Sequence, residues 1–144
     1  KIAPEHSVDH VLKHMGKPSE EALRNFLREV SLLSSRNRYT IGYFIAAHPG
    51  CSMQDMVELK TFVNKEMHYN PEQVQIFTPT PATYSTAMYY TGIASEDGDQ
   101  IFVERSTSGR REQKDVLTKK ENLKRESEQN IGGTGNKRHN RNWH

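Results

Sequence analysis

The chain has 144 residues, a formal net charge of +2 and 33% hydrophobic residues, which fits one domain with an ordinary core. Its single cysteine, Cys51, excludes an intrachain disulfide and a thiolate metal cluster supplied by this chain alone, and favours a reducing, cytoplasmic setting. No run of about 18 apolar residues occurs, so we expect no membrane-spanning segment.

Charge and hydrophobicity divide the chain into two parts. Residues 1–103 hold nearly all the large apolar side chains and carry 9 basic and 12 acidic residues, a net charge of −3. Residues 104–144 carry 11 basic and 6 acidic residues, a net charge of +5. The contrast predicts an ordered body over 1–103 and a flexible basic tail over 104–144. Within the tail, the pattern predicts a helix near 111–125 and disorder over 126–144.

The first part of the body predicts a strand followed by two helices. Residues 1–6 form a short apolar run with a polar end. Ser7 or Asp9 can cap a helix that continues to about Met15, and Ser19 can cap the next one. Apolar residues of the second helix recur at three- and four-residue steps and predict one buried stripe: Leu23, Phe26, Leu27, Val30 and Leu33.

The second part of the body continues the alternation of strands and helices. Residues 39–47 are almost continuously apolar, which predicts a strand buried on both faces, as in a parallel sheet. A helix follows from Ser52 to about Met67, and further strands are expected at 74–77 and 101–103. The predicted inner side of this helix consists of Met53, Met56, Val57, Leu59, Phe62 and Val63. The order of elements predicts an α/β fold of three parallel strand–helix units with right-handed crossovers.

Polar residues follow each of the three strands. Glu5 ends the first, His48 follows the second, and the run 78–81 (Thr-Pro-Thr-Pro) follows the third. In α/β proteins, ligands collect outside the carboxyl ends of strands, so these positions predict part of an active-site rim. Each also has a structural interpretation. Glu5 could serve the dipole of the next helix, His48 could satisfy a turn, and 78–81 could be a stiff loop.

Other candidate groups favour structural roles. His6, His10 and His14 are spaced by four residues, which can place imidazoles for a metal, but histidines on a helix surface are commoner than metal sites. Cys51 begins a helix, where a thiol can be activated, but no second cysteine or base accompanies it, which favours a buried or idle thiol. Met53 and Met56 are better explained by core packing than by a ligand site.

Four separated motifs occur in an order that resembles one enzyme family. They are residues 1–6 with 15–18, residues 43–50, residues 72–81, and residues 85–92. Together they resemble the radical S-adenosylmethionine (radical SAM) enzymes, specifically the uncharacterised YgiQ-type family, over residues 1 to about 103. The resemblance implies a partial (β/α)6, TIM-like barrel, of which this chain would be the second half. In such enzymes S-adenosylmethionine lies over a [4Fe–4S] cluster, and its reduction yields a radical that abstracts hydrogen from a substrate.

The resemblance also implies roles for particular residues. Glu5 would contact the amino or ribose groups of the cofactor, the backbone of 46–48 would line its adenine, and the threonines would face cofactor or substrate. The family's three cluster cysteines precede the matching region and are absent, so the chain alone should be catalytically silent. We therefore expect a fragment that lacks the N-terminal half of its barrel and whose substrate is unknown. The implied cofactor-binding residues are Glu5, Ala46, Ala47, His48, Thr78 and Thr80.

Two rival hypotheses come from the residues themselves. The fragment could be a binding module whose basic tail holds RNA or a protein partner, or a scaffold without any site. A half barrel would also leave sheet edges unpaired and one sheet face uncovered. We therefore expect self-association or loose packing unless the tail helix covers the gap.

Overall fold

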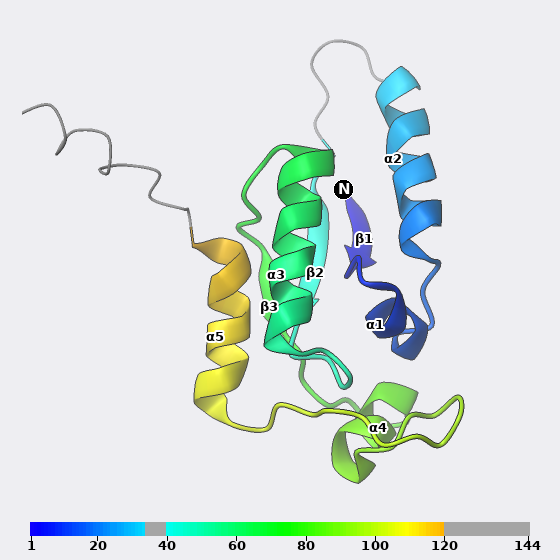
Figure 1. Ribbon diagram of the computed structural model, residues 1–144, viewed down its shortest axis with the longest axis vertical. Helices are drawn as coiled ribbons and strands as arrows, with labels where there is room; N and C mark the ends of the chain where they lie inside the picture. The colour runs from blue at the N-terminus through cyan, green and yellow to red at the C-terminus, as the bar shows by residue number, and fades with distance from the viewer. Residues whose placement is uncertain (34–39, 120–144) are drawn as a thin grey trace, which may run out of the picture.

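The computed structural model describes residues 1–33 and 40–119. The strands form one parallel sheet in the order β1-β2-β3, which confirms the predicted α/β class with parallel strands. The elements in chain order are β1 (Ile2–Glu5), α1 (Asp9–His14), α2 (Glu20–Leu33), β2 (Gly42–Ala46), α3 (Met53–Phe62), the π-helical turn η1 (Val63–Met67), β3 (Val74–Ile76), α4 (Tyr84–Thr91) and α5 (Thr107–Thr118) (Figure 1).

Side-chain caps begin most of these helices. At α3, the Ser52 hydroxyl accepts from the N–H of Asp55 and the Asp55 carboxylate accepts from the N–H of Ser52, a complete capping box. The predicted cap of α1 by Ser7 or Asp9 is wrong, because Val8 occupies that position without a side-chain bond. The Asp9 carboxylate instead accepts from the N–H of Glu20, at 2.7 Å, and so joins α1 to the start of α2.

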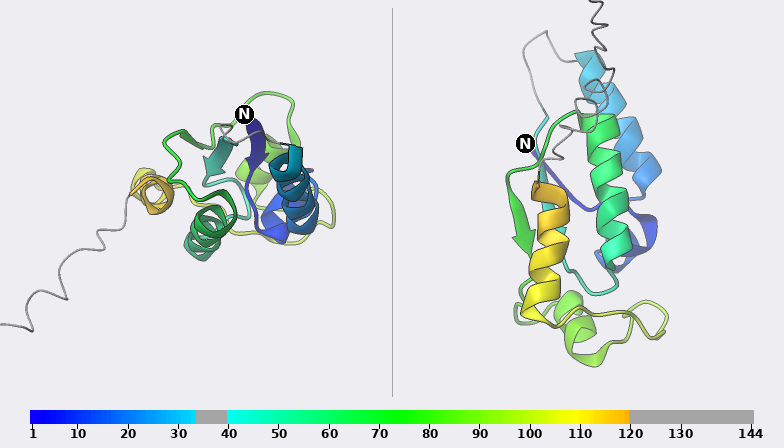
Figure 2. Two further views of the ribbon diagram at one scale, coloured as in Figure 1. Left: turned by 90° about the horizontal axis from the view of Figure 1, so that it is seen from above. Right: turned by 60° about the vertical axis from the view of Figure 1, so that its left-hand side comes forward.

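The core lies between the sheet and the pair α3 and α5, which pack against each other on one face (Figure 2). Along β2, Phe44 and Ala46 point into this core, whereas Tyr43 and Ile45 are only half-buried. The predicted burial of this strand on both faces is therefore wrong for the described part of the chain. The buried core consists of Val11, Phe44, Ala46, Cys51, Met56, Leu59, Phe62, Val63, Val74 and Leu117.

The predicted buried stripe of α2 is also wrong. No residue of α2 is buried, and Leu33 is 83% exposed. Within the part of the chain that the structure describes, Leu23 and Leu27 are the residues of α2 that pack against the core. A cavity of about 460 Å³ opens between β1 and α2, lined by apolar residues that include Leu23 and Phe26. The apolar face of α2 thus exceeds what the described residues cover.

The inner side predicted for the helix after Ser52, now α3 and η1, is correct at four of its six positions. Met56, Leu59, Phe62 and Val63 are buried. Met53 and Val57 are partly exposed and line a cavity of about 380 Å³ between α3 and α5. The error follows from the place of α5, which covers one flank of α3 and leaves these two side chains at the rim.

The remaining differences concern the segment after β3. Residues 101–103 form no strand; the carbonyl of Phe102 instead accepts from the N–H of Gly50, at 2.8 Å. A helix, α4, follows the loop after β3, at residues for which the sequence predicted no helix or strand. The helix predicted near 111–125 begins earlier, and its range beyond 119 lies outside the described residues. So do residues 126–144 and the RNA or protein contacts predicted for them.

Among residues 1–33 and 40–119, no helix combines the length and the apolar character that a membrane crossing requires.

Candidate functional site

The carboxyl ends of the three strands meet at one edge of the sheet, as the sequence predicted. Glu5 lies beside Phe44 of β2, and Ala46 lies beside Ile76 of β3. The carbonyl of Ala46 also accepts from the N–H of Phe77, at 2.8 Å, just beyond β3. The helices α1 and α4 lie at this end of the sheet (Figure 1). Segments distant in sequence therefore share one edge.

Two neighbouring strand tips have strained backbones. Glu5 has φ 65° and Ala47 has φ 59°, both in the left-handed region that favours glycine. Such a conformation costs a non-glycine residue about 1–2 kcal/mol and persists only where its surroundings fix it. Strained residues of this kind gather at ligand sites, because they turn backbone groups away from regular pairing.

Glu5 pairs with a lysine rather than serving a helix start. Its carboxylate lies 3.2 Å from the ammonium of Lys17, which also donates to the carbonyl of Ala3 at 3.3 Å. The side chain of Glu5 keeps 25% exposure. A cationic group of a ligand could therefore reach this carboxylate by sharing it with Lys17.

His48 is held entirely within the protein. Its Nδ1–H donates to the carbonyl of Pro49 and its Nε2 accepts from the hydroxyl of Ser85, both at 2.8 Å. The ring packs edge-on against Phe77, with 5.2 Å between centroids. Burial lowers the pKa of His48 to about 4, so the ring is neutral at pH 7. The contacts tie the tip of β2 to β3 and α4.

The two threonines lie on the exposed loop after β3. The hydroxyl of Thr78 donates to the carbonyl of Ile76 at 3.3 Å, and the N–H of Thr80 donates to the hydroxyl of Thr86 at 2.8 Å. Both threonines are exposed, whereas Ala46 and Ala47 are buried. The six predicted residues thus share one edge of the sheet but divide into an accessible group and a buried group. The accessible group is Glu5, Thr78 and Thr80; the buried group is Ala46, Ala47 and His48.

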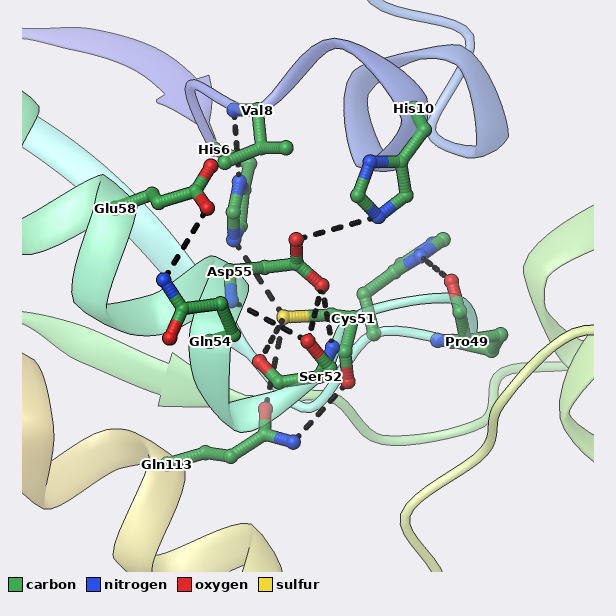
Figure 3. Close-up of polar contacts among 11 residues, drawn as sticks. His6, Val8, His10, Pro49, Cys51, Ser52, Gln54, Asp55, Glu58 and Gln113 are labelled. Carbon is green, nitrogen blue, oxygen red and sulfur yellow. Dashed lines mark hydrogen bonds and ion pairs between the residues drawn. The ribbon is translucent and has the colours of Figure 1, made fainter.

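A buried polar cluster around His6 and Cys51 lies next to the ends of β1 and β2 (Figure 3). The N–H of Val8 donates to Nδ1 of His6, so the Nε2–H of the neutral ring points at the sulfur of Cys51, 3.5 Å away. Burial lowers the pKa of His6 to about 4 and raises that of Cys51 to about 12. Both groups are therefore neutral, and the prediction of a buried thiol is confirmed.

Sequence reasoning did not predict that Asp55 and Gln113 join this cluster. The carboxylate oxygen Oδ1 of Asp55 lies 3.3 Å from Nε2 of His10. Gln113 lies 3.6 Å from the sulfur of Cys51. The cap spacing of Ser52 and Asp55 gave a signal for Asp55, but nothing in the sequence connects Gln113 to residues more than 60 positions earlier.

The three regularly spaced histidines go to different partners. His6 precedes α1 and joins the buried cluster, His10 pairs with Asp55, and His14 pairs with Glu96. Within the part of the chain that the structure describes, no group of three or more histidine, cysteine or acidic side chains is placed to hold a metal ion.

Gly50, in the turn after β2, is expected to tolerate no side chain. Its φ is +86°, and a Cβ atom there would lie 2.3 Å from Cδ2 of His14. We expect Gly50→Ala to lower the free energy of unfolding by about 2 kcal/mol or more, measured by urea denaturation. Gly98 has φ +79° with nothing within 4 Å of the same Cβ position, so Gly98→Ala is a matched control for backbone strain alone. Equal losses in the two variants would contradict the steric explanation.

Curated relatives match most of this chain. A protein of Fusobacterium nucleatum is 44% identical over 123 residues, which is 83% of this chain and 22% of that protein. A protein of Thermotoga maritima is 44% identical over 124 residues, again 83% of this chain and 22% of the relative. A protein of Methanocella arvoryzae is 46% identical over 114 residues, 77% of this chain and 19% of the relative. All three are named UPF0313 proteins.

The chain belongs to the UPF0313 family. This is the YgiQ-type family that the sequence motifs indicated, so that prediction is confirmed, and the chain corresponds to a C-terminal portion of a UPF0313 protein. It spans about a fifth of the length of these UPF0313 relatives. No family model matches the chain. No solved structure matches it either.

Proposed function

We propose that the full-length UPF0313 protein is a radical SAM enzyme that binds S-adenosylmethionine at the carboxyl ends of β1, β2 and β3. The observation that carries the proposal is the pair of strained tips, Glu5 and Ala47, on neighbouring parallel strands. Strain at this edge fits a ligand site, because this edge is where α/β proteins bind ligands.

The uncovered sheet face gives further support. Parallel sheets are almost always covered on both faces, yet Tyr43 and Ile45 are only half-buried here. The hydroxyl of Tyr43 donates to the side-chain carbonyl of Gln75 on the neighbouring strand, so this face carries ordered polar groups. Since the relatives are several times longer, the rest of the protein would cover this face and enclose a ligand beside it.

The residues present fit one of the two cofactors. An iron–sulfur cluster is held by several cysteine thiolates, and this chain offers only a buried, neutral Cys51. The cluster ligands would therefore come from elsewhere in the protein. For S-adenosylmethionine, Glu5 offers a carboxylate to the amino group, and Thr78 and Thr80 offer exposed hydroxyls. Ala46, Ala47 and His48 would shape the site through their backbone rather than through exposed side chains.

When bound together, the two cofactors supply one-electron reduction of S-adenosylmethionine and so begin radical chemistry on a substrate. Anaerobic reconstitution of the full-length protein with iron and sulfide tests this. We expect a [4Fe–4S] spectrum and release of 5′-deoxyadenosine on reduction. A protein that assembles no cluster would contradict the enzyme proposal.

The role of Glu5 has its own test. We expect Glu5→Gln to weaken S-adenosylmethionine binding by the full-length protein about tenfold, measured by equilibrium dialysis, because a charge-assisted hydrogen bond becomes a neutral one. Glu72→Gln changes an exposed carboxylate just before β3 and is the control for loss of one charge. Equal affinities of Glu5→Gln and the unaltered protein would remove Glu5 from the site.

A further inference from the structure

One side chain of α5 bridges the turn that follows β2. Gln113 is 1% exposed. Its Oε1 accepts from the N–H of Ala47 at 2.9 Å. Its Nε2 donates to the carbonyl of Cys51 at 3.1 Å (Figure 3). A single amide therefore binds both ends of the turn 47–51.

Ala47 needs such a partner because it leaves the regular sheet. The carbonyl of Ala46 still pairs with Phe77 beyond β3, but the N–H of Ala47 donates to Gln113 of α5, and the backbone of Ala47 then turns left-handed. A buried N–H without an acceptor would be costly, and the strained conformation is itself unfavourable. Inside the turn, the N–H of Cys51 donates to the carbonyl of His48 at 2.9 Å. The two bonds of Gln113 thus close a turn that also holds this backbone bond and the bond from the ring of His48 to the carbonyl of Pro49.

The helix α5 fixes where this amide lies. The Ser106 hydroxyl caps the helix by accepting from the N–H of Gly109 at 3.0 Å, which sets its first turn. Gly109, Gln113 and Leu117 are its buried residues and recur at four-residue steps, so they share one face. An apolar residue would bury at position 113 without needing partners. A glutamine there is explained by the two backbone groups that it binds.

We propose that Gln113 is a positioning residue for the cofactor site: it holds the tip of β2 in the conformation that receives S-adenosylmethionine. The inference rests on the proposed function. It extends the site beyond the residues that resemble the radical SAM barrel, because α5 follows that segment in the chain. Without Gln113, the turn would spend part of its time in other conformations, and the apparent affinity would fall with the fraction that remains competent.

The test uses Gln113→Met in the full-length protein, a change that keeps the length of the side chain and removes both hydrogen bonds. We expect S-adenosylmethionine to bind about tenfold more weakly, as it would if the competent fraction fell to about a tenth. Hydrogen exchange of peptides covering 47–51, without any ligand, should become faster, while peptides of β2 keep their protection. Gln113→Glu, which keeps an acceptor for Ala47 and loses the donor to Cys51, is the second variant if Gln113→Met does not fold.

Leu117→Val is the matched control, since it removes one methylene group from the same buried face of α5, four residues away, and leaves Gln113 in place. It should leave the affinity unchanged. Faster exchange at 47–51 with unchanged affinity would overturn the positioning role and leave the proposed function intact. Equal loss of affinity in Leu117→Val would assign the effect to α5 packing and would also overturn it. An unaltered protein that binds no S-adenosylmethionine would overturn both proposals.

Discussion

Acidification from pH 7 to pH 4 is expected to remove about 3 kcal/mol of folding free energy for each of two buried histidines, His6 and His48. Burial lowers the pKa of both rings to about 4 in the folded chain, against an ordinary value of 6.5. Between these pH values the unfolded chain binds protons that the folded chain does not. Stability is therefore complete above pH 6.5 and falls as the pH approaches 4. Urea denaturation at a series of pH values measures the loss.

The pH range over which stability is lost identifies the groups responsible for the loss. Hydrogen bonds from Lys13 and Ser106 hold the pKa values of Asp97 and Glu104 below their ordinary range, so these carboxylates lose their contribution at lower pH than the histidines do. A His6→Gln variant should show about half of the pH dependence between 6.5 and 4.5, because one of the two rings is gone. Stability that does not change over this interval would show that the rings are not buried as neutral groups.

Leu117→Ala is expected to lower the free energy of unfolding by about 3 kcal/mol. Leu117 is fully buried in the core between the sheet and the helix pair α3 and α5, so its removal leaves a cavity. Chemical denaturation of the whole chain measures the change.

Leu33→Ala makes the same chemical change at a side chain that is 83% exposed and should alter stability by less than about 0.5 kcal/mol. If the two variants lost equal stability, α5 would not belong to the folded body.

The fold was predictable where hydrophobic patterns are long. The three parallel strands and the cap of α3 follow from runs of apolar residues and from the spacing of Ser52 and Asp55. The place of α5 was not predictable from composition, because Val116 and Leu117, which pack on the core, stand among basic and polar residues. The predicted burial of the apolar stripe of α2 was wrong for the opposite reason. Its residues are spaced for burial, but the described chain offers them little to pack against.

The candidate site was predictable only in part. Strand ends locate Glu5 and His48 at one edge, since carboxyl ends of parallel strands meet there. The left-handed backbone of Ala47 leaves no mark in the sequence, because alanine is not a residue that favours it. The hydrogen bond between Gln113 and Ala47 was not predictable either, because it depends on the packing of a helix residue that lies 66 positions further along the chain.

We propose that the tips of β1 and β2 form part of an S-adenosylmethionine site. The most direct measurement is hydrogen–deuterium exchange of the full-length, cluster-reconstituted protein with and without S-adenosylmethionine. We predict slower exchange in peptides covering Glu5, the turn 47–51 and Thr80, with little change in α2. Slower exchange only in segments outside these tips would contradict the proposed site. So would unchanged exchange at a concentration of S-adenosylmethionine that saturates binding.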